Sequence, residues 1–326
     1  MQLTQYLALL FLATATLAKN ILLTNDDSWI STNIRATYYK LKEAGHEVYL
    51  VAPVSQRSGW GGRFDVPTSP TLQTDGEFGY VKAGAPSWGH EDFDDHIWYF
   101  NGTPASAVAF ALTYVFPVHF NLSEDFRPDL VVSGPNEGTN PGAFYTISGT
   151  MGATYNSVYR NIPAIAFSGS NGNNSLYTDF LDLNDTLEPS TIYAGLVTEL
   201  VDTLFKSQGD NERALPLGVG YNVNFPPVGY QNETCISPKW TNTRFSGLAA
   251  AGADMYYNAT SNSFVWTSSS WDALAACYNG DCSLPSENYV LAYGSCQTTV
   301  SAFSIDYDAN TELSAQSNAL FAPLFN

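Results

Sequence analysis

The apolar positions near the start of the chain predict a β-α-β unit. Residues 21–23 form a short unbroken apolar run, as expected of a parallel strand that is covered on both faces. Ile34, Tyr38 and Leu41 then recur at helical spacing. A second apolar run at residues 48–52 completes the unit, because it has the length and composition of another buried strand.

The same arrangement returns further along the chain. Residues 129–133 form an apolar strand that ends in the polar, glycine-rich loop 134–140. Pro104 stands at the first-turn position of an expected helix, where proline is favoured. Further strands are expected at 98–100, 164–167, 217–225 and 300–305, a β-hairpin at 255–257 and 264–266, and helices at 148–160, 189–204 and 313–321. The alternation of strands and helices predicts an α/β protein.

Composition and charge limit the partners of such a protein. The 326 residues are 44% hydrophobic and 13% charged, which suits a large core in one α/β domain, alone or with an appendage. The net charge of −18 would repel a nucleic acid polymer or an anionic membrane. A small anionic substrate would need a local positive focus, which a metal, helix N-termini and Arg57 could supply. The plainer interpretation is that the acidity keeps a secreted protein soluble.

The first 18 residues resemble a secretory signal peptide. An apolar run at 7–12 is followed by small residues that end at Ala18, and the run is too short to span a membrane. N-x-[ST] sequons occur at Asn101, Asn121, Asn173, Asn184, Asn232 and Asn258. The sequon at Asn101 is followed by Pro104 and lies near the predicted site, so it can remain without a glycan. We therefore expect an extracellular protein that is N-glycosylated in a eukaryotic secretory pathway.

The four cysteines all lie in the C-terminal third of the chain. An even count in an exported protein indicates two disulfides, and four cysteines allow three pairings. We favour Cys277 with Cys282, which closes a small loop, and Cys235 with Cys296, which ties the ends of the region.

Polar residues follow the predicted parallel strands where each strand ends. Asp26 and Asp27 come after the first strand, and Arg57, Ser58 and Gly59 come after the second. Ligands of open α/β sheets bind beyond the carboxyl ends of the strands, so these tips should face one crevice. Two adjacent carboxylates there favour a hard divalent cation, Mg²⁺, Mn²⁺ or Ca²⁺.

A turn of Ser148, Gly149 and Thr150 enters the predicted helix at 148–160. Free backbone N–H groups at a helix N-terminus can bind an anion such as phosphate. The alternative is that Ser148 only caps the helix.

Other hydrolytic and nucleotide-binding mechanisms lack their motifs. The chain has no G-x-S-x-G elbow, no Arg-His-Gly run, no P-loop and only four histidines. The acidic run at 91–96 could bind a metal, but a solvated acidic loop is the favoured interpretation.

The motifs together resemble the SurE survival-protein phosphatases, which are metal-dependent nucleotidases and acid phosphatases. The resemblance covers most of the mature chain, and each piece alone is weakly specific. It rests on Leu22–Asp27, Val51–Pro53, Arg57–Gly59, Gly102–Pro104, Asp129–Asn136 with Gly138 and Asn140, and Ser148–Thr150. The sequence departs from the family at Ser28, where glycine is usual, at 105–106, and in the 65–95 stretch, which has no clear counterpart.

The resemblance implies a three-layer Rossmann-like fold with a mostly parallel sheet, a β-hairpin extension and a C-terminal segment often exchanged between subunits, hence a homodimer or higher homo-oligomer. We divide the chain into a signal peptide at 1–18 and a SurE-like domain at 19–326. Within that domain, 19–225 would be the α/β core, 226–299 the extension with the hairpin and disulfides, and 300–326 the C-terminal strand and helix.

The resemblance also implies the site. Asp26, Asp27, Ser58 and Asn136 would hold one divalent cation. Asn140 and Ser148, Gly149 and Thr150 would line the phosphate position, so the expected catalytic set is Asp26, Asp27, Asn140, Ser148, Gly149 and Thr150. Whether Asp26 attacks phosphorus, serves as a base, or leaves attack to water stays open. The expected function is a secreted phosphomonoesterase of the acid phosphatase or 5'(3')-nucleotidase type; the alternative is a non-catalytic nucleotide- or glycan-binding protein.

Overall fold

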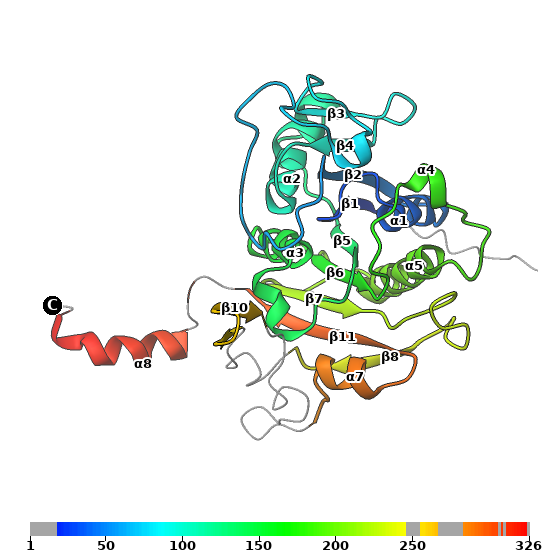
Figure 1. Ribbon diagram of the computed structural model, residues 1–326. Coiled ribbons are helices and arrows are strands. Elements are labelled where there is room, and N and C mark those ends of the chain that lie inside the picture. Colours follow the sequence, from blue (N-terminus) through cyan, green and yellow to red (C-terminus); the bar gives the residue numbers. More distant parts are fainter. Residues whose placement is uncertain (1–17, 246–254, 267–282, 306–307, 309–310, 325–326) are drawn as a thin grey trace, which may run out of the picture.

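The structure, a computed structural model, describes residues 18–245, 255–266, 283–305, 308 and 311–324 (Figure 1). The expected signal peptide, apart from its last residue, and the expected Cys277–Cys282 disulfide lie outside these residues. No helix among the described residues has the length and apolar content needed to cross a membrane.

One mostly parallel sheet forms the middle of the described structure, as predicted. Its strands, in spatial order, are β3 (Trp88–His90), β4 (Ile97–Phe100), β2 (Glu47–Pro53), β1 (Asn20–Thr24), β5 (Leu130–Glu137), β6 (Ala164–Gly169), β7 (Val219–Asn224), β11 (Gln297–Ser304) and β8 (Lys239–Thr243). The strands from β4 to β7 all run parallel to their neighbours. Within this sheet, the described antiparallel pairings are those of β3 with β4 and of β11 with β7.

Helices cover both faces of this sheet and give the expected three layers (Figure 1). On one face lie α1 (Thr32–Glu43) and α5 (Pro189–Gln208), and on the other α2 (Pro104–Phe110), a π-helical segment η2 (Ala111–His119) and α3 (Gly149–Tyr159). Successive strand side chains point to opposite faces, so Ile21 and Leu23 join the core under α1 and α5 while Leu22 joins the other core. The unbroken apolar run at 21–23 follows from this double coverage.

The 65–95 stretch is mostly irregular, with a short helix η1 (Glu77–Gly79) and the edge strand β3. A buried ion pair joins it to the domain, because the guanidinium of Arg35 in α1 donates to the carboxylate of Glu91. The same guanidinium lies 4.3 Å from the ring centre of Tyr177, in the short helix α4 (Tyr177–Phe180). A buried pair of this kind fixes the position of the stretch beside the sheet.

The C-terminal part contributes both to the sheet and to projecting elements. The predicted hairpin is confirmed as β9 (Met255–Asn258) paired antiparallel with β10 (Ser263–Trp266). Helix α7 (Glu287–Tyr293) packs against β11, whereas α8 (Thr311–Phe321), followed by η5 (Ala322–Leu324), extends away from the domain (Figure 1). Strand β8 joins the main sheet beside β11, although no strand is expected from the sequence in this part of the segment 226–299.

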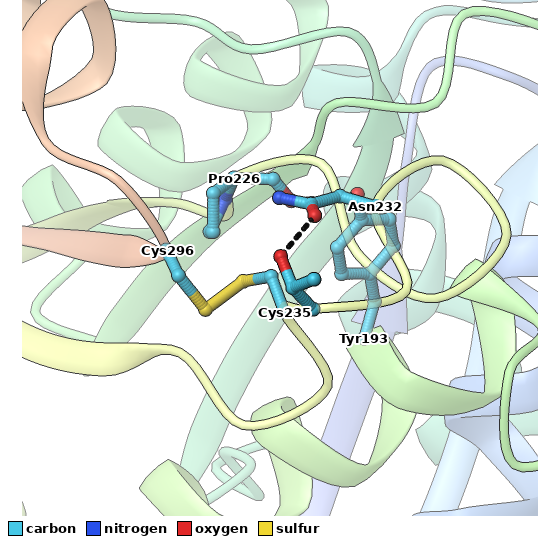
Figure 2. Close-up of a disulfide and its surroundings, with 6 residues drawn as sticks. Tyr193, Pro226, Asn232, Cys235 and Cys296 are labelled. Carbon is cyan, nitrogen blue, oxygen red and sulfur yellow. Dashed lines mark hydrogen bonds between the residues drawn. A yellow bond between two sulfur atoms is a disulfide. The ribbon is translucent and has the colours of Figure 1, made fainter.

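The predicted disulfide between Cys235 and Cys296 is confirmed (Figure 2). Its Cα atoms lie 5.4 Å apart, and Cys235 is fully buried. Cys296 immediately precedes β11, and Cys235 lies shortly before β8 in the sequence. The bond therefore ties together the beginnings of the two outermost strands on this side of the sheet.

We expect removal of this disulfide to destabilise the protein substantially. A crosslink between residues 61 apart restricts the unfolded chain, which corresponds to about 4 kcal/mol in the chain-entropy description. The double variant Cys235→Ala/Cys296→Ala should therefore unfold at lower denaturant concentration than the wild type in non-reducing buffer. Equal midpoints for the two proteins would contradict this role.

Candidate active site

Asp26 and Asp27 are buried just beyond the end of β1. The hydroxyl of Thr150 donates a 2.6 Å hydrogen bond to Oδ1 of Asp26, and the backbone N–H of Glu137 donates a 2.7 Å bond to Oδ2 of Asp27. Thr150 belongs to α3 and Glu137 ends β5. The two carboxylates lie at the carboxyl end of the strand, as the sequence predicts, and their hydrogen bonds connect β1 to α3 and β5.

A cavity of about 220 Å³ opens beside Asp26. Its walls come from the loop after β2, the end of β5 with the following loop, and the residues before α3: Asp26, Ser58, Gly59, Asn136, Glu137, Gly138, Thr139, Asn140, Phe144, Ile147 and Ser148. Of the predicted site residues, Asp26, Ser58, Asn136, Asn140 and Ser148 therefore share one cavity. Asp27, Gly149 and Thr150 are also buried but do not line the cavity. Gly149 and Thr150 contact Asp26, and Asp27 contacts the end of β5 at Glu137.

The turn after the acidic pair depends on an unusual backbone conformation at Ser28, whose φ is +89°. L-residues rarely adopt this region, and glycine does so without cost, which explains why glycine is usual here in the family that the sequence resembles. The carbonyl of Ser28 accepts hydrogen bonds from the side chains of Asn25 and Ser31. These bonds hold the turn in place with serine at this position.

The beginning of α3 packs directly on Asp26. Ser148 is the N-cap residue, and its hydroxyl accepts a hydrogen bond from the N–H of Met151. Ser148 therefore caps the helix, as the alternative interpretation held, and also lines the cavity. At Gly149 an added Cβ would lie 2.7 Å from Cβ of Asp26, so only glycine allows this approach.

We expect Gly149→Ala to displace the Asp26 side chain and lower any activity of the site, while the fold is retained. A Cβ at this distance forces one of the two residues to move. Gly195→Ala is the matched control, because Gly195 is exposed in α5 with no atom within 4 Å of an added Cβ. Helical alanine there should be neutral or stabilising by about 1 kcal/mol. Full activity in Gly149→Ala would show that the close packing is not needed.

The carboxylates of the site have no cationic side-chain partner in the part of the chain that the structure describes. Burial raises the pKa of the Asp26 carboxyl, although hydrogen bonds from Thr150 and from the backbone at Gly149 lower it. Burial raises the pKa of Asp27 further, with repulsion from Asp26 and Glu137. Burial also raises the pKa of Glu137, to about 8. None of the three forms an ion pair with a basic side chain among the described residues, so a bound cation would relieve their repulsion.

The neighbouring groups fit a hard cation. The side-chain amide of Asn136 donates a 2.6 Å hydrogen bond to the carbonyl of Gly138, which leaves its Oδ1 buried and without a hydrogen-bond partner in the described part of the chain. The backbone N–H of Arg57 donates to the carbonyl of Asp26, which places Ser58 at the cavity. Carboxylate, amide and hydroxyl oxygens form a donor set suited to Mg²⁺, Mn²⁺ or Ca²⁺.

Residues 21–248 match the sequence model of the family described as survival protein SurE. The chain belongs to the SurE family. An acid phosphatase of Yarrowia lipolytica is 45% identical over 304 residues, which cover 92% of this chain and 83% of that protein.

More distant members of the SurE family include bacterial nucleotidases. A 5'-nucleotidase SurE from Desulfovibrio desulfuricans is 36% identical over 151 residues, 46% of this chain and 49% of that protein. The crystal structure of the SurE protein from Aquifex aeolicus matches with a TM-score of 0.59 and 23% identity, over 92% of this chain and 99% of that one. At this identity the structural match supports the fold alone.

In this SurE-family chain, a network of buried amides positions Asn140. Its backbone N–H donates to Oδ1 of Asn224, its side-chain amide donates to the hydroxyl of Ser168, and its carbonyl accepts from the amide of Asn222. The Asn222 amide also contacts the Glu287 carboxylate at 3.1 Å. Asn140 is therefore held from β6 and β7, the two strands beyond β5.

Glu287 completes this network from α7, a part of the chain far from the predicted site. Its carboxylate also accepts from the backbone N–H of Gly142, two residues beyond Asn140, and the side chain is fully buried. Burial raises the pKa of Glu287 to about 8, even though hydrogen bonds from Ser301, Gly142 and Asn222 lower it. Sequence reasoning missed this residue, because a single glutamate at the start of a short helix carries no motif.

We expect Glu287 to make the stability of the fold depend on pH. Its pKa is about 8 in the folded protein and near the ordinary 4.5 in the unfolded chain, so between these values the folded state binds more protons. The free energy of unfolding from this group therefore falls as pH rises from about 4.5 to about 8. Glu287→Gln should flatten the decline of the melting temperature across this window, measured with chelator present.

The exposed Glu212 provides the control for this experiment. Glu212→Gln makes the same substitution at an exposed position and should keep the wild-type pH dependence of the melting temperature. An unchanged dependence in Glu287→Gln would show that Glu287 does not titrate differently in the folded and unfolded states.

The acidic stretch that precedes β4 contains a second group of possible metal ligands. Oxygen and nitrogen atoms of Asp94, Asp95 and His96 lie within 4.8 Å of one another. These residues lie before β4, hence at the opposite edge of the parallel sheet from Asp26. Their groups also bind one another and nearby side chains, with Tyr38 donating to Asp94 and His119 within 3.1 Å of Asp95. The cluster is thus separate from the predicted site.

Proposed function

We propose that this protein is a divalent-metal-dependent phosphomonoesterase that acts on small phosphate esters. The observation that carries the proposal is the pair Asp26 and Asp27, buried without a cationic partner among the described residues, beside the unbonded Oδ1 of Asn136 and a cavity at the N-terminus of α3. Membership of the SurE family supports it, as do the names of the relatives, acid phosphatase and 5'-nucleotidase.

In this proposal Asp26, Asp27, Ser58 and Asn136 hold the cation. A divalent cation held there would supply positive charge for the phosphoryl oxygens and would make a water molecule more acidic. Thr150 orients Asp26 through its hydrogen bond, and the backbone N–H of Glu137 orients Asp27.

In our proposal the phosphate group binds beside Asn140 and Ser148, which line the cavity. One amide hydrogen of Asn140 is used by Ser168, so the other remains to bind a phosphoryl oxygen. The backbone at Gly149 and Thr150 hydrogen-bonds Asp26, so in our proposal these residues act on the phosphate through Asp26. Fixed donors of this kind stabilise charge without reorganising during the reaction.

The proposal extends to the location and the oligomeric state of the enzyme. We propose a secreted glycoprotein that forms a homodimer or a higher homo-oligomer and binds neither nucleic acid polymers nor membranes, in keeping with its net charge of −18. The Cys235–Cys296 disulfide and the exposure of the sequon residues Asn121, Asn173 and Asn184 support this setting.

We expect Asp26→Asn and Asp27→Asn each to lower kcat/KM for phosphate release by about 100-fold or more, because each removes half of the negative charge that would hold the ion. Calorimetric titration with Mn²⁺ should show the same loss in metal binding, and circular dichroism should show a retained fold. Asp210→Asn is the control, since Asp210 is exposed and removal of its charge should change neither quantity. Unchanged turnover in Asp26→Asn would overturn the assignment of the site.

The alternative function, a nucleotide- or glycan-binding protein without turnover, is tested on the wild type. Phosphate release should be measured on nucleotide and non-nucleotide esters from acidic to neutral pH, with and without chelator. Release that chelator abolishes would support the phosphatase. Saturable binding of the esters with no release after metal addition would support the alternative.

A further inference from the structure

A second cavity, of about 540 Å³, lies next to the candidate active site. It is lined on one side by Arg57, Trp60, Arg63, Phe64 and Asp65 from the stretch after β2, and on the other by the loop after β4, which includes Asn101. Arg57 lines this cavity, and the next residue, Ser58, lines the first one. Their Cα atoms are about 3.8 Å apart, so a single loop separates the two cavities.

Arg57 presents a positive charge without a carboxylate partner among the described residues. Its guanidinium donates to neutral oxygens, the carbonyls of Gly102 and Gln56 and the amide oxygen of Asn101, at 3.1–3.4 Å. Burial lowers the pKa of Arg57, although the carboxylates of Asp65 and Glu77 nearby raise it, and neither carboxylate forms a direct ion pair with Arg57 in the described part of the chain. A partly buried guanidinium has lost hydration, and an anion would restore a partner for its unused N–H groups.

The ring of Trp60 contacts two arginines that line the second cavity. The guanidinium carbons of Arg57 and Arg63 lie 4.9 and 4.4 Å from the centre of its ring. Arg63 also pairs with Asp65 at 2.7 Å. With two guanidinium groups and one carboxylate in its lining, the cavity has a net charge of about +1, although the whole chain carries −18.

We propose that this second cavity is a leaving-group subsite that selects phosphomonoesters with a further anionic group, a carboxylate or a second phosphate, remote from the phosphate that is cleaved. The inference rests on the proposed function, because it needs the scissile phosphate in the first cavity. The rest of such an ester then crosses the loop at Ser58 and places its anion near Arg57 and Arg63. Asp65 limits the preference, since it neutralises Arg63.

The test compares matched esters that differ only in the second anion. Suitable pairs are 3-phosphoglycerate with glycerol 3-phosphate, a carboxyphenyl phosphate with phenyl phosphate, and a nucleoside 3',5'-bisphosphate with the 5'-monophosphate. The measured quantity is the ratio of kcat/KM for the anionic ester to kcat/KM for its partner. We expect the ratio to exceed one for the wild type and to fall as ionic strength rises. The carboxylate and bisphosphate pairs show which anion is preferred.

Three substitutions should move this ratio in different directions. Arg57→Gln should lower it about tenfold and Arg63→Gln about threefold, because the first charge is more buried and forms no direct ion pair with a carboxylate in the described chain. Asp65→Asn should raise it about threefold by freeing Arg63. Opposite changes from neighbouring residues cannot come from general damage to the fold. Arg127→Gln, at an exposed arginine away from both cavities, should leave the ratio unchanged.

The outcomes separate this inference from the proposed function. If neither ester of any pair releases phosphate with metal present, the proposed function fails. If both esters are cleaved with equal kcat/KM, or if the ratio is the same in Arg57→Gln, Asp65→Asn and the wild type, the subsite is overturned and the phosphatase stands. A wild-type ratio above one that falls in Arg57→Gln and rises in Asp65→Asn supports the subsite.

Discussion

The burial of two adjacent carboxylates at the end of β1 is the constraint on which the site depends. Neither Asp26 nor Asp27 can remain charged beyond the reach of water without partners. The hydroxyl of Thr150 and the backbone N–H of Glu137 supply hydrogen bonds, but not a positive charge. The surrounding loops are shaped by this requirement: β5 ends against Asp27, and α3 begins so close to Asp26 that only glycine fits at residue 149.

Support for this arrangement comes from parts of the chain far from the acidic pair. Asn140 is held by side chains of β6 and β7, and Glu287 in α7 binds both Asn222 and the backbone of the loop that follows Asn140. The disulfide between Cys235 and Cys296 secures the beginnings of β8 and β11, so that α7 has a fixed surface to pack against. The C-terminal region therefore contributes to the geometry of the cavity although it supplies none of the predicted ligands.

In our proposal the two cavities have different tasks, although the loop after β2 lines both of them. The first is built from strand ends and contains the oxygens that would bind a cation. The second is built largely from the stretch that follows β2, and it contains two arginines. A chain with net charge −18 can bind an anionic ester only where local cations outweigh the general repulsion.

Local patterns in the sequence determined the α/β alternation and the position of Asp26 and Ser58 at strand ends, because buried parallel strands read as short apolar runs followed by polar loops. The resemblance to the SurE family added the three layers and the place of Asn136, and the even cysteine count favoured the Cys235–Cys296 bond. Only the tertiary structure decided that β8 joins the sheet and that Arg57 lines the second cavity. It also decided that Gly149 and Thr150 pack on Asp26, and that Glu287 binds the groups that position Asn140. These contacts join residues up to 145 positions apart, as between Gly142 and Glu287, and no local periodicity encodes them.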